Sequence, residues 1–304
     1  NFLCAENLYP ENISFQQFDY IFKQKLTQLS EQEQINPICL LMECLEPHCK
    51  LTRTHEGEYT RYILENKILA HTKNKYSDKN QNIVITDLGP GGLFQNLIII
   101  TRLLNEGYNN LTINLIDSGY MDYYLSKEDP NYLNKLKEEN DFDGIHIAIF
   151  NHHMFRQYFA YLKQNFPNAN IKMNIFENIQ KYLLLTISNP ELKTDLFLSI
   201  DTIESDSTES IIESLVSFYI SNALKVNGLV FLCFDAENID CEEEIGCPEE
   251  EKRNVITIFR KESEPMHEAD FPESVEYLPI LMHNPEKPEY LSNYKILESF
   301  VVHR

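Results

Sequence analysis

The pattern of hydrophobic positions along the chain changes near residue 79. Before it, apolar residues recur at helical spacing, as they do between Phe15 and Leu29. After it, short apolar runs alternate with amphipathic helical stretches, which is typical of a parallel sheet with helices on both faces. The sequence therefore predicts an N-terminal helical segment over residues 1–78, followed by an α/β domain over residues 79–304.

Seven apolar runs predict strands, and the stretches between them predict helices. We expect the strands at residues 83–87, 112–116, 172–176, 195–200, 229–234, 254–261 and 295–303. We expect the helices of this domain at residues 94–107, 145–166, 177–188 and 208–225. An earlier helix is expected over residues 56–71, before the polar linker "HTKNKYSDKNQN". The last two strands would close a sheet of about seven strands as an added pair.

The connection between the second and third strands is long. Roughly 55 residues separate Asp117 from Lys172, where a simple crossover needs far fewer. We therefore expect an insertion at about residues 121–165, which contains the polar stretch "SKEDPNYLNKLKEENDFDG". It would lie over one rim of the sheet, either as a lid or substrate platform or as a surface decoration.

Composition narrows the classes of partner and compartment. The chain carries 47 Asp and Glu against 26 Lys and Arg, a net charge of −21, which argues against a nucleic-acid partner. No apolar run approaches the roughly 18 to 20 residues that span a bilayer, so we expect a soluble protein. Seven scattered cysteines favour a cytoplasmic or other reducing intracellular compartment. Because the chain begins at Asn1 rather than Met, we expect that upstream residues were removed, which leaves export or targeting open.

The cysteines do not predict a metal site. Cys39, Cys44 and Cys49, with His48 beside the last, are spaced more widely than the usual zinc pairs, and no second pair completes a tetrahedron. His146, His152 and His153 fall on one predicted helix, but their spacing does not make a metal pair.

The stretch "VITDLGPGGLFQN" places a glycine-rich turn between a predicted strand and a predicted helix. Such a turn lets the backbone approach a ligand closely, and the helix start offers free amide donors. The dinucleotide fingerprint needs a third glycine where this chain has Phe94. Asp87, at the end of the strand, would repel a phosphate but attract an ammonium group or accept hydrogen bonds from hydroxyls. The site is expected to prefer a ligand without phosphates.

At this turn the chain resembles the class I S-adenosylmethionine-dependent methyltransferases, which have a Rossmann-like fold. The family's first motif is an acidic residue followed by Gly-x-Gly, and "TDLGPGG" matches it at Asp87, Gly89 and Gly91. Leu93 departs from a glycine that the family often has there, although Gly92 lies beside it. The resemblance implies that S-adenosylmethionine is the cofactor, with Asp87 near its amino group and the glycines beneath it.

A second acidic residue extends the resemblance, since the family has one at the end of the second strand that binds both ribose hydroxyls. "INLIDSGY" supplies Asp117 at that place. NAD-binding folds use an acid in the same way, so Asp117 supports an adenosine more than it chooses between cofactors. Glu177 and Asn178 follow the third strand, where the family contacts the adenine. Alternatively, Asp117 is a solvated acid or helix cap, and Glu177 is an acid favoured at a helix start.

The residues that carry out methyl transfer are harder to predict, because the protein mainly aligns the reactants and removes a proton. Asp201 and Glu204 follow the fourth strand and are the candidates for orienting or deprotonating an amine or hydroxyl, or else they cap the next helix. The tetrapeptide of the amino-methyltransferases, with two prolines and an aromatic residue, is absent there. The run "ENIDCEEEIGCPEEE" carries eight acids and would favour a cationic acceptor if it borders the cleft.

Two functions therefore remain open. The first is a methyltransferase acting on a protein or small-molecule acceptor. The second is a methyltransferase-like binding or scaffolding protein that has lost catalysis. The sequence does not indicate the oligomeric state.

Overall fold

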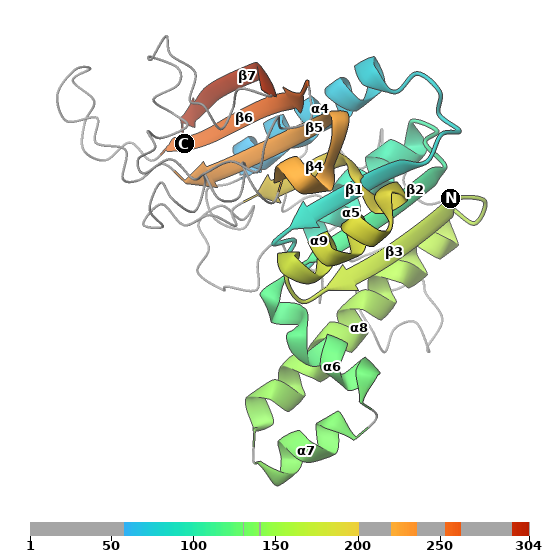
Figure 1. Ribbon diagram of the computed structural model, residues 1–304, viewed down its shortest axis with the longest axis vertical. Coiled ribbons are helices and arrows are strands. Elements are labelled where there is room, and N and C mark those ends of the chain that lie inside the picture. Colours follow the sequence, from blue (N-terminus) through green and yellow to red (C-terminus); the bar gives the residue numbers. More distant parts are fainter. Residues whose placement is uncertain are drawn as a thin grey trace, which may run out of the picture. The chain divides into compact units, whose positions relative to one another are not determined.

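The computed structural model describes residues 58–129, 131–139, 141–200, 220–235, 253–262 and 294–303 of the 304-residue chain. These residues contain a seven-stranded sheet in the order β3-β2-β1-β4-β5-β6-β7 (Figure 1). The order reverses at β1, from which β2 and β3 follow on one side and β4 and β5 on the other. This arrangement is that of the doubly wound dinucleotide-binding folds, in which ligands bind outside the carboxyl ends of the strands at the reversal. The predicted Rossmann-like sheet of about seven strands is therefore confirmed.

Every predicted strand is present, within a few residues of its expected bounds. The strands are β1 (Ile83–Leu88), β2 (Asn110–Ile116), β3 (Asn170–Phe176), β4 (Thr194–Ile200), β5 (Leu224–Asp235), β6 (Arg253–Lys261) and β7 (Tyr294–His303). The α-helices are α4 (Glu58–Lys75), α5 (Phe94–Asn105), α6 (Met121–Glu128), α7 (Tyr132–Glu138), α8 (Phe142–Asn165), α9 (Ile179–Ser188) and α11 (Ser221–Ala223), and two short 3-10 helices are η2 (Ser118–Tyr120) and η3 (Pro190–Leu192). β5–β6 and β6–β7 are antiparallel pairs, as expected for the strands that close the sheet.

The described chain forms two compact units, of which the first comprises α4 and residues 90–178. In this unit β2 and β3 are parallel, and their register places Ile116 opposite Phe176 at the carboxyl ends. Helix α5 is buried along most of its length and ends before Gly107, whose positive φ of 96° suits a glycine that terminates a helix. The helix starts directly after the glycine turn, so its packing fixes one end of that turn.

A buried polar network joins α4 to the first turn of α5. The Arg61 guanidinium donates to Oε1 of Gln95, and Gln95 Nε2 donates to Oε1 of Glu65 at 3.0 Å. All three side chains are almost fully buried. Because buried polar groups are costly unless they are hydrogen-bonded, this network favours one position of α4 against the start of α5.

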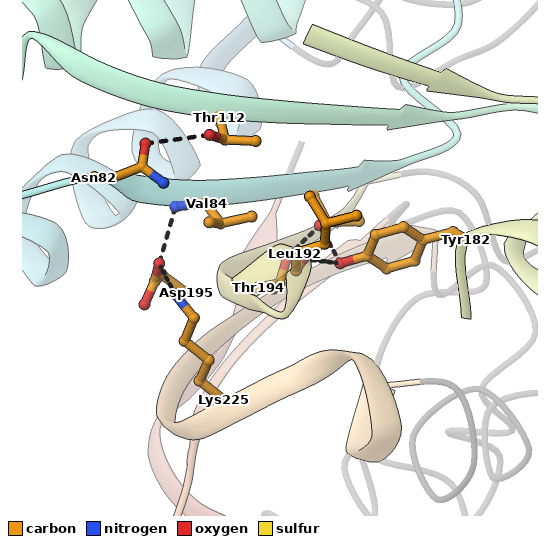
Figure 2. Close-up of polar contacts among 9 residues, drawn as sticks. Asn82, Val84, Thr112, Tyr182, Leu192, Thr194, Asp195 and Lys225 are labelled. Carbon is orange, nitrogen blue, oxygen red and sulfur yellow. Dashed lines mark hydrogen bonds and ion pairs between the residues drawn. The ribbon is translucent and has the colours of Figure 1, made fainter. Parts of the chain in front are cut away.

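The second unit comprises residues 83–89 and the chain from Ile179 onward. Its strands β1, β4 and β5 are parallel and carry a core of aliphatic and aromatic side chains. At the amino end of β4, Asp195 accepts from the backbone N–H of Val84 at 2.9 Å and from Lys225 Nζ at 2.7 Å (Figure 2). A single carboxylate therefore links the starts of three neighbouring strands.

Several sequence expectations need correction. Residues 121–165, expected as an insertion, contain α6 and α7, which were not predicted, and α8, which matches the helix expected at residues 145–166; α6 and α7 lie beside α8 (Figure 1). That these residues are an insertion stays a prediction. Helix α4 continues to Lys75, into the expected linker. The helix predicted at residues 208–225 overlaps the start of β5 at Leu224, because the strand begins five residues earlier than expected. Residues 208–219 and the predicted helices before residue 58 lie outside the described residues, and the boundary at residue 78 stays a prediction.

None of the described helices is both long and apolar enough to cross a bilayer.

Candidate cofactor site

The turn after β1 contains three residues with left-handed backbone conformations. Gly89 has a φ of 70°, Gly91 of 52° and Leu93 of 65°. The N–H of Leu93 donates to the Pro90 carbonyl at 3.0 Å, and the Leu93 carbonyl accepts from Leu97 as α5 begins. Glycine adopts this conformation without steric cost, whereas in leucine it strains the backbone by about 1 kcal/mol or more. The residue that departs from the family's third glycine therefore keeps a glycine-like conformation.

Leu93 retains this conformation because its side chain is completely buried. It occupies the N-cap position of α5 and makes no side-chain cap, and Phe94 behind it is also buried. The apolar contacts of Leu93 offset the strain. In the sequence, Gly92 lies beside Leu93, the position at which the family often has a glycine. Gly92 does not have a positive φ, and Leu93 does.

Asp87 lies in β1, one residue before its end, and is only 3% exposed. In the parallel register it stands opposite Leu198 of β4. Its carboxylate is therefore largely removed from water at the start of the turn. Its predicted contact with the cofactor amino group stays a prediction.

Asp117 follows β2 and is held by the backbone at three points. Its N–H donates to the Phe176 carbonyl at the end of β3, at 3.1 Å. Its Oδ1 accepts from the Gly119 N–H at 2.8 Å, and its Oδ2 accepts from the Gly91 N–H at 3.0 Å. Each carboxylate oxygen has a second lone pair, so the carboxylate is oriented in advance and can still accept from a ligand.

The pKa of Asp117 is raised from its ordinary value because the carboxyl is largely removed from water, while the bonds from Gly119 and Gly91 act in the opposite direction. Its two amide donors favour the ionised form, which is the form that accepts hydrogen bonds from hydroxyl groups. The geometry and the donors together fit a carboxylate that binds a vicinal diol.

Both the N–H and the carbonyl of Gly91 are hydrogen-bonded. Besides its N–H bond to Asp117, its carbonyl accepts from the Tyr120 hydroxyl at 2.6 Å. Tyr120 is fully buried, and its ring lies edge-on to Phe155 of α8 at 4.9 Å between centroids. The turn was expected to offer free amides to a ligand, but the Gly91 amide is already bonded to Asp117.

Glu177 and Asn178 lie between β3 and α9, at the edge of the sheet where Asp117 lies. The β2–β3 register aligns Ile116 with Phe176, so Asp117 and Glu177 are the next residues along each strand. Glu177 is 8% exposed, and Asn178 is half-buried. The structure thus brings Gly91, Asp117 and Glu177 to one edge of this unit, and the adenine contact stays a prediction.

The structure does not describe the predicted catalytic pair. Strand β4 ends at Ile200, and Asp201 and Glu204 lie outside the described residues, as do the cysteines of the rejected metal spacing. Within the described ranges, no group of three or more His, Cys, Asp or Glu side chains is placed to hold a metal ion. Among the histidines of α8, His152 lies 2.8 Å from the Ser126 hydroxyl and against the Tyr123 ring, which indicates a packing role.

Sequence reasoning missed two residues that shape this site. Tyr120 was not among the predicted site residues, yet its hydroxyl is bonded to the glycine turn. Asn151 of α8 was not singled out, and its Nδ2 donates to the Gly119 carbonyl at 2.7 Å. The adjacency of Asp117, Gly119 and Tyr120 could have drawn attention to Tyr120. Asn151 has no such signal, because a contact over 32 positions leaves no trace in local spacing.

Comparison with known proteins returns structural neighbours only. No protein-family model and no curated protein matches the sequence. The chain is similar to the rRNA methyltransferase aviRa from Streptomyces viridochromogenes (11% identity, 65% of this chain and 83% of that one, TM-score 0.36). It is also similar to the calicheamicin methyltransferase CalS11 (13% identity, 73% and 79%, TM-score 0.35) and to CalS10, a SAM-bound amino pentose methyltransferase from Micromonospora echinaspora (10% identity, 69% of each chain, TM-score 0.28).

The structure itself carries the assignment of the fold. It places an acidic residue and a glycine turn at the end of β1, a second acidic residue directly after β2 and an antiparallel pair at the far end of the sheet. With these features in the order that the sequence predicts, the chain has a Rossmann-like fold.

Proposed function

We propose that this protein is an S-adenosylmethionine-dependent methyltransferase that acts on a protein or small-molecule acceptor. The observation that carries the proposal is the Asp117 carboxylate, which the amides of Gly91 and Gly119 fix in place. A carboxylate oriented in this way loses little freedom when it binds a ribose diol. Two charge-assisted hydrogen bonds of that kind contribute on the order of 2 to 3 kcal/mol.

The resemblance assigns the other predicted cofactor residues to the same ligand. Gly89, Gly91 and Gly92 let the backbone pass close beneath it, and Asp87 would attract its ammonium group. Glu177 and Asn178, beyond β3, would face the adenine. When bound, S-adenosylmethionine supplies a methyl group on a sulfonium, which leaves the protein to align the acceptor and remove its proton.

Asp201 and Glu204 are the residues we propose for that task, because they directly follow β4, beside β1 in the sheet. We further propose a cationic acceptor. The net charge of −21 and the eight acids of residues 237–251 favour positively charged molecules over nucleic acids through long-range attraction.

Calorimetry with S-adenosylmethionine, its demethylated product S-adenosylhomocysteine and NAD tests the cofactor. We expect both sulfur compounds to bind and NAD to bind much more weakly. Asp117→Ala should weaken the binding of S-adenosylhomocysteine by about 30-fold, which corresponds to 2 kcal/mol. Asp129→Ala is the matched control, because Asp129 forms an ion pair with Lys135 on the same unit and should leave binding unchanged.

Two results would contradict the proposal. One is no binding of either sulfur compound at millimolar concentration, and the other is wild-type affinity in a folded Asp117→Ala variant. Transfer of a labelled methyl group to Lys- and Arg-rich peptides and polyamines then tests catalysis. Cofactor binding without transfer to any acceptor would favour the alternative, a methyltransferase-like binding or scaffolding protein.

A further inference from the structure

Helix α8 reaches the candidate cofactor site through Asn151. This side chain is fully buried, and its Nδ2 donates to the Gly119 carbonyl at 2.7 Å. Only the NH2 group of the amide can donate to a carbonyl, so this bond fixes the orientation of the amide. The N–H of the same Gly119 donates to Oδ1 of Asp117. Asn151 is therefore linked to the carboxylate proposed to bind the ribose through a single intervening residue, Gly119.

The segment that carries Asp117 has little regular structure of its own. Residues 118–120 form a single 3-10 turn, closed by the bonds from Tyr120 to Asp117 and from Met121 to Ser118. Gly119 in its middle lacks a side chain and has wide conformational freedom. Its N–H donates to Asp117 and its carbonyl accepts from Asn151, and the second of these bonds comes from outside the segment.

A second contact from α8 restrains the same segment. Phe155 lies four residues after Asn151 and thus on the same face of the helix. Its ring packs against Tyr120, whose hydroxyl is bonded to the Gly91 carbonyl. One face of α8 therefore supports both Gly119 and Tyr120, which in turn hold Asp117 and Gly91.

The amide of Asn151 is retained although half of it has no partner among the described residues. Its Oδ1 is buried without a hydrogen bond. An apolar side chain at position 151 would avoid this cost. The hydrogen bond that Asn151 donates to Gly119 is therefore the structural reason for an amide at this position. A purely space-filling role does not explain it.

We propose that Asn151 is a positioning residue for Asp117, which acts through Gly119 to hold the carboxylate in the conformation that binds the ligand diol. This inference rests on the proposed function. Asn151 does not contact the ligand. Its effect is to make Asp117 ordered before the ligand arrives, so that less conformational freedom is lost on binding.

The test compares two asparagines of α8 in the full chain. Asn165 is the matched control, because its Nδ2 also donates to a backbone carbonyl, that of Tyr161 at 2.8 Å, and its Oδ1 is also buried without a partner. Asn151→Ala and Asn165→Ala are each compared with the wild type by amide hydrogen exchange and by binding of S-adenosylhomocysteine.

In Asn151→Ala we expect the amides of Gly119 and Gly91 to exchange at least about tenfold faster, because both donate to Asp117. We expect affinity for S-adenosylhomocysteine to fall by about tenfold, the equivalent of one hydrogen bond. Asn165→Ala should change neither. Asn151→Leu, which has no hydrogen-bond donor and fills the buried site better than alanine, should reproduce the exchange effect if the alanine variant folds poorly.

The exchange measurement needs no ligand, so it separates this inference from the proposed function. Unchanged exchange at Gly119 and Gly91 in folded Asn151 variants would overturn the inference even if the wild type binds the cofactor. Faster exchange in a protein that binds no sulfur compound would support the positioning of Asp117 and overturn the proposed ligand. Equal loss in the Asn165 control would show a general effect of α8 on stability and overturn the inference.

Discussion

Oδ2 of Asp117 accepts a hydrogen bond of 3.0 Å from the backbone N–H of Gly91, 26 positions earlier in the chain. Two features that sequence reasoning assigned separately to a cofactor are therefore bonded to each other. The acidic residue after β2 stabilises the glycine turn after β1, and the turn orients the acidic residue. Ligand affinity and local stability are coupled through this bond.

The bond predicts how binding depends on pH. Burial raises the pKa of Asp117 above its ordinary value of 3.8. The protonated carboxyl accepts hydrogen bonds from hydroxyls less well, so affinity for S-adenosylhomocysteine should fall as the pH is lowered through this raised pKa. Carbon-13 NMR titration, with Asp117→Asn to assign the signal, should give a midpoint above 3.8. In the same spectra Asp129 should titrate below 3.8, because its bond with Lys135 lowers its pKa.

The same shift fixes the sign of a stability effect. The folded chain binds a proton at Asp117 more readily than the unfolded chain does. The contribution of Asp117 to the free energy of unfolding is therefore most favourable below the unfolded pKa and is lost as the pH rises through the folded pKa. A midpoint at or below 3.8 would contradict the burial of this carboxyl.

Leu93 predicts an unusual order of stabilities. Leu93→Ala and Leu93→Gly both remove a buried side chain, at a cost of about 2 to 5 kcal/mol for the alanine variant. Glycine also relieves the strain of the left-handed backbone, so Leu93→Gly should be more stable than Leu93→Ala by about 1 kcal/mol. Urea denaturation followed by circular dichroism measures the difference.

Leu97 provides the control for this order. It is equally buried, one turn further along α5, and its backbone is helical. There Leu97→Gly should be less stable than Leu97→Ala by about 1 kcal/mol. If both positions show the same order, the φ of 65° at Leu93 does not describe the folded protein.

The ion pair between Asp195 and Lys225 predicts that removing Asp195 destabilises the protein more than removing Lys225. Asp195→Ala leaves the Val84 N–H without this acceptor and Lys225 without its ion pair, so the free energy of unfolding should fall by about 2 to 4 kcal/mol. Lys225→Met removes a half-exposed partner and should cost only about 1 kcal/mol. Adding Lys225→Met to Asp195→Ala should cost almost nothing further. Additive losses would show that the two side chains do not interact.

The strands and the glycine turn could be predicted from the sequence because their signals are local. Buried strands such as β4 read as short apolar runs, and Gly89 and Gly91 mark the turn directly. Asp117 was placed correctly after β2 for the same reason. Its bond to Gly91 could not be predicted, since it depends on how two distant loops meet.

Helices α6 and α7 were harder to predict than α8, which matches the helix expected at residues 145–166. Helix α7 has seven residues, and its sequence is mostly polar. It is held by tertiary contacts, including the bond from the Tyr132 hydroxyl to Asp122 of α6 at 2.6 Å. Short polar helices of this kind have weak intrinsic stability, so hydrophobic periodicity does not reveal them. Asn151 could not be predicted from local sequence either, because its proposed role depends on a contact between α8 and the segment after β2.

Two pairs of asparagines cross the β2–β3 strand pair in register. Asn170 donates to Asn110 at 2.9 Å, and Asn174 donates to Asn114 at 2.8 Å. If β3 slipped by one residue during folding, both amide pairs would break, and the Phe176 carbonyl would leave the Asp117 N–H. These amide pairs therefore specify the register of β3 against β2. The same register brings the Phe176 carbonyl to the Asp117 N–H, so the alignment set by two asparagine pairs also fixes the backbone position of the carboxylate.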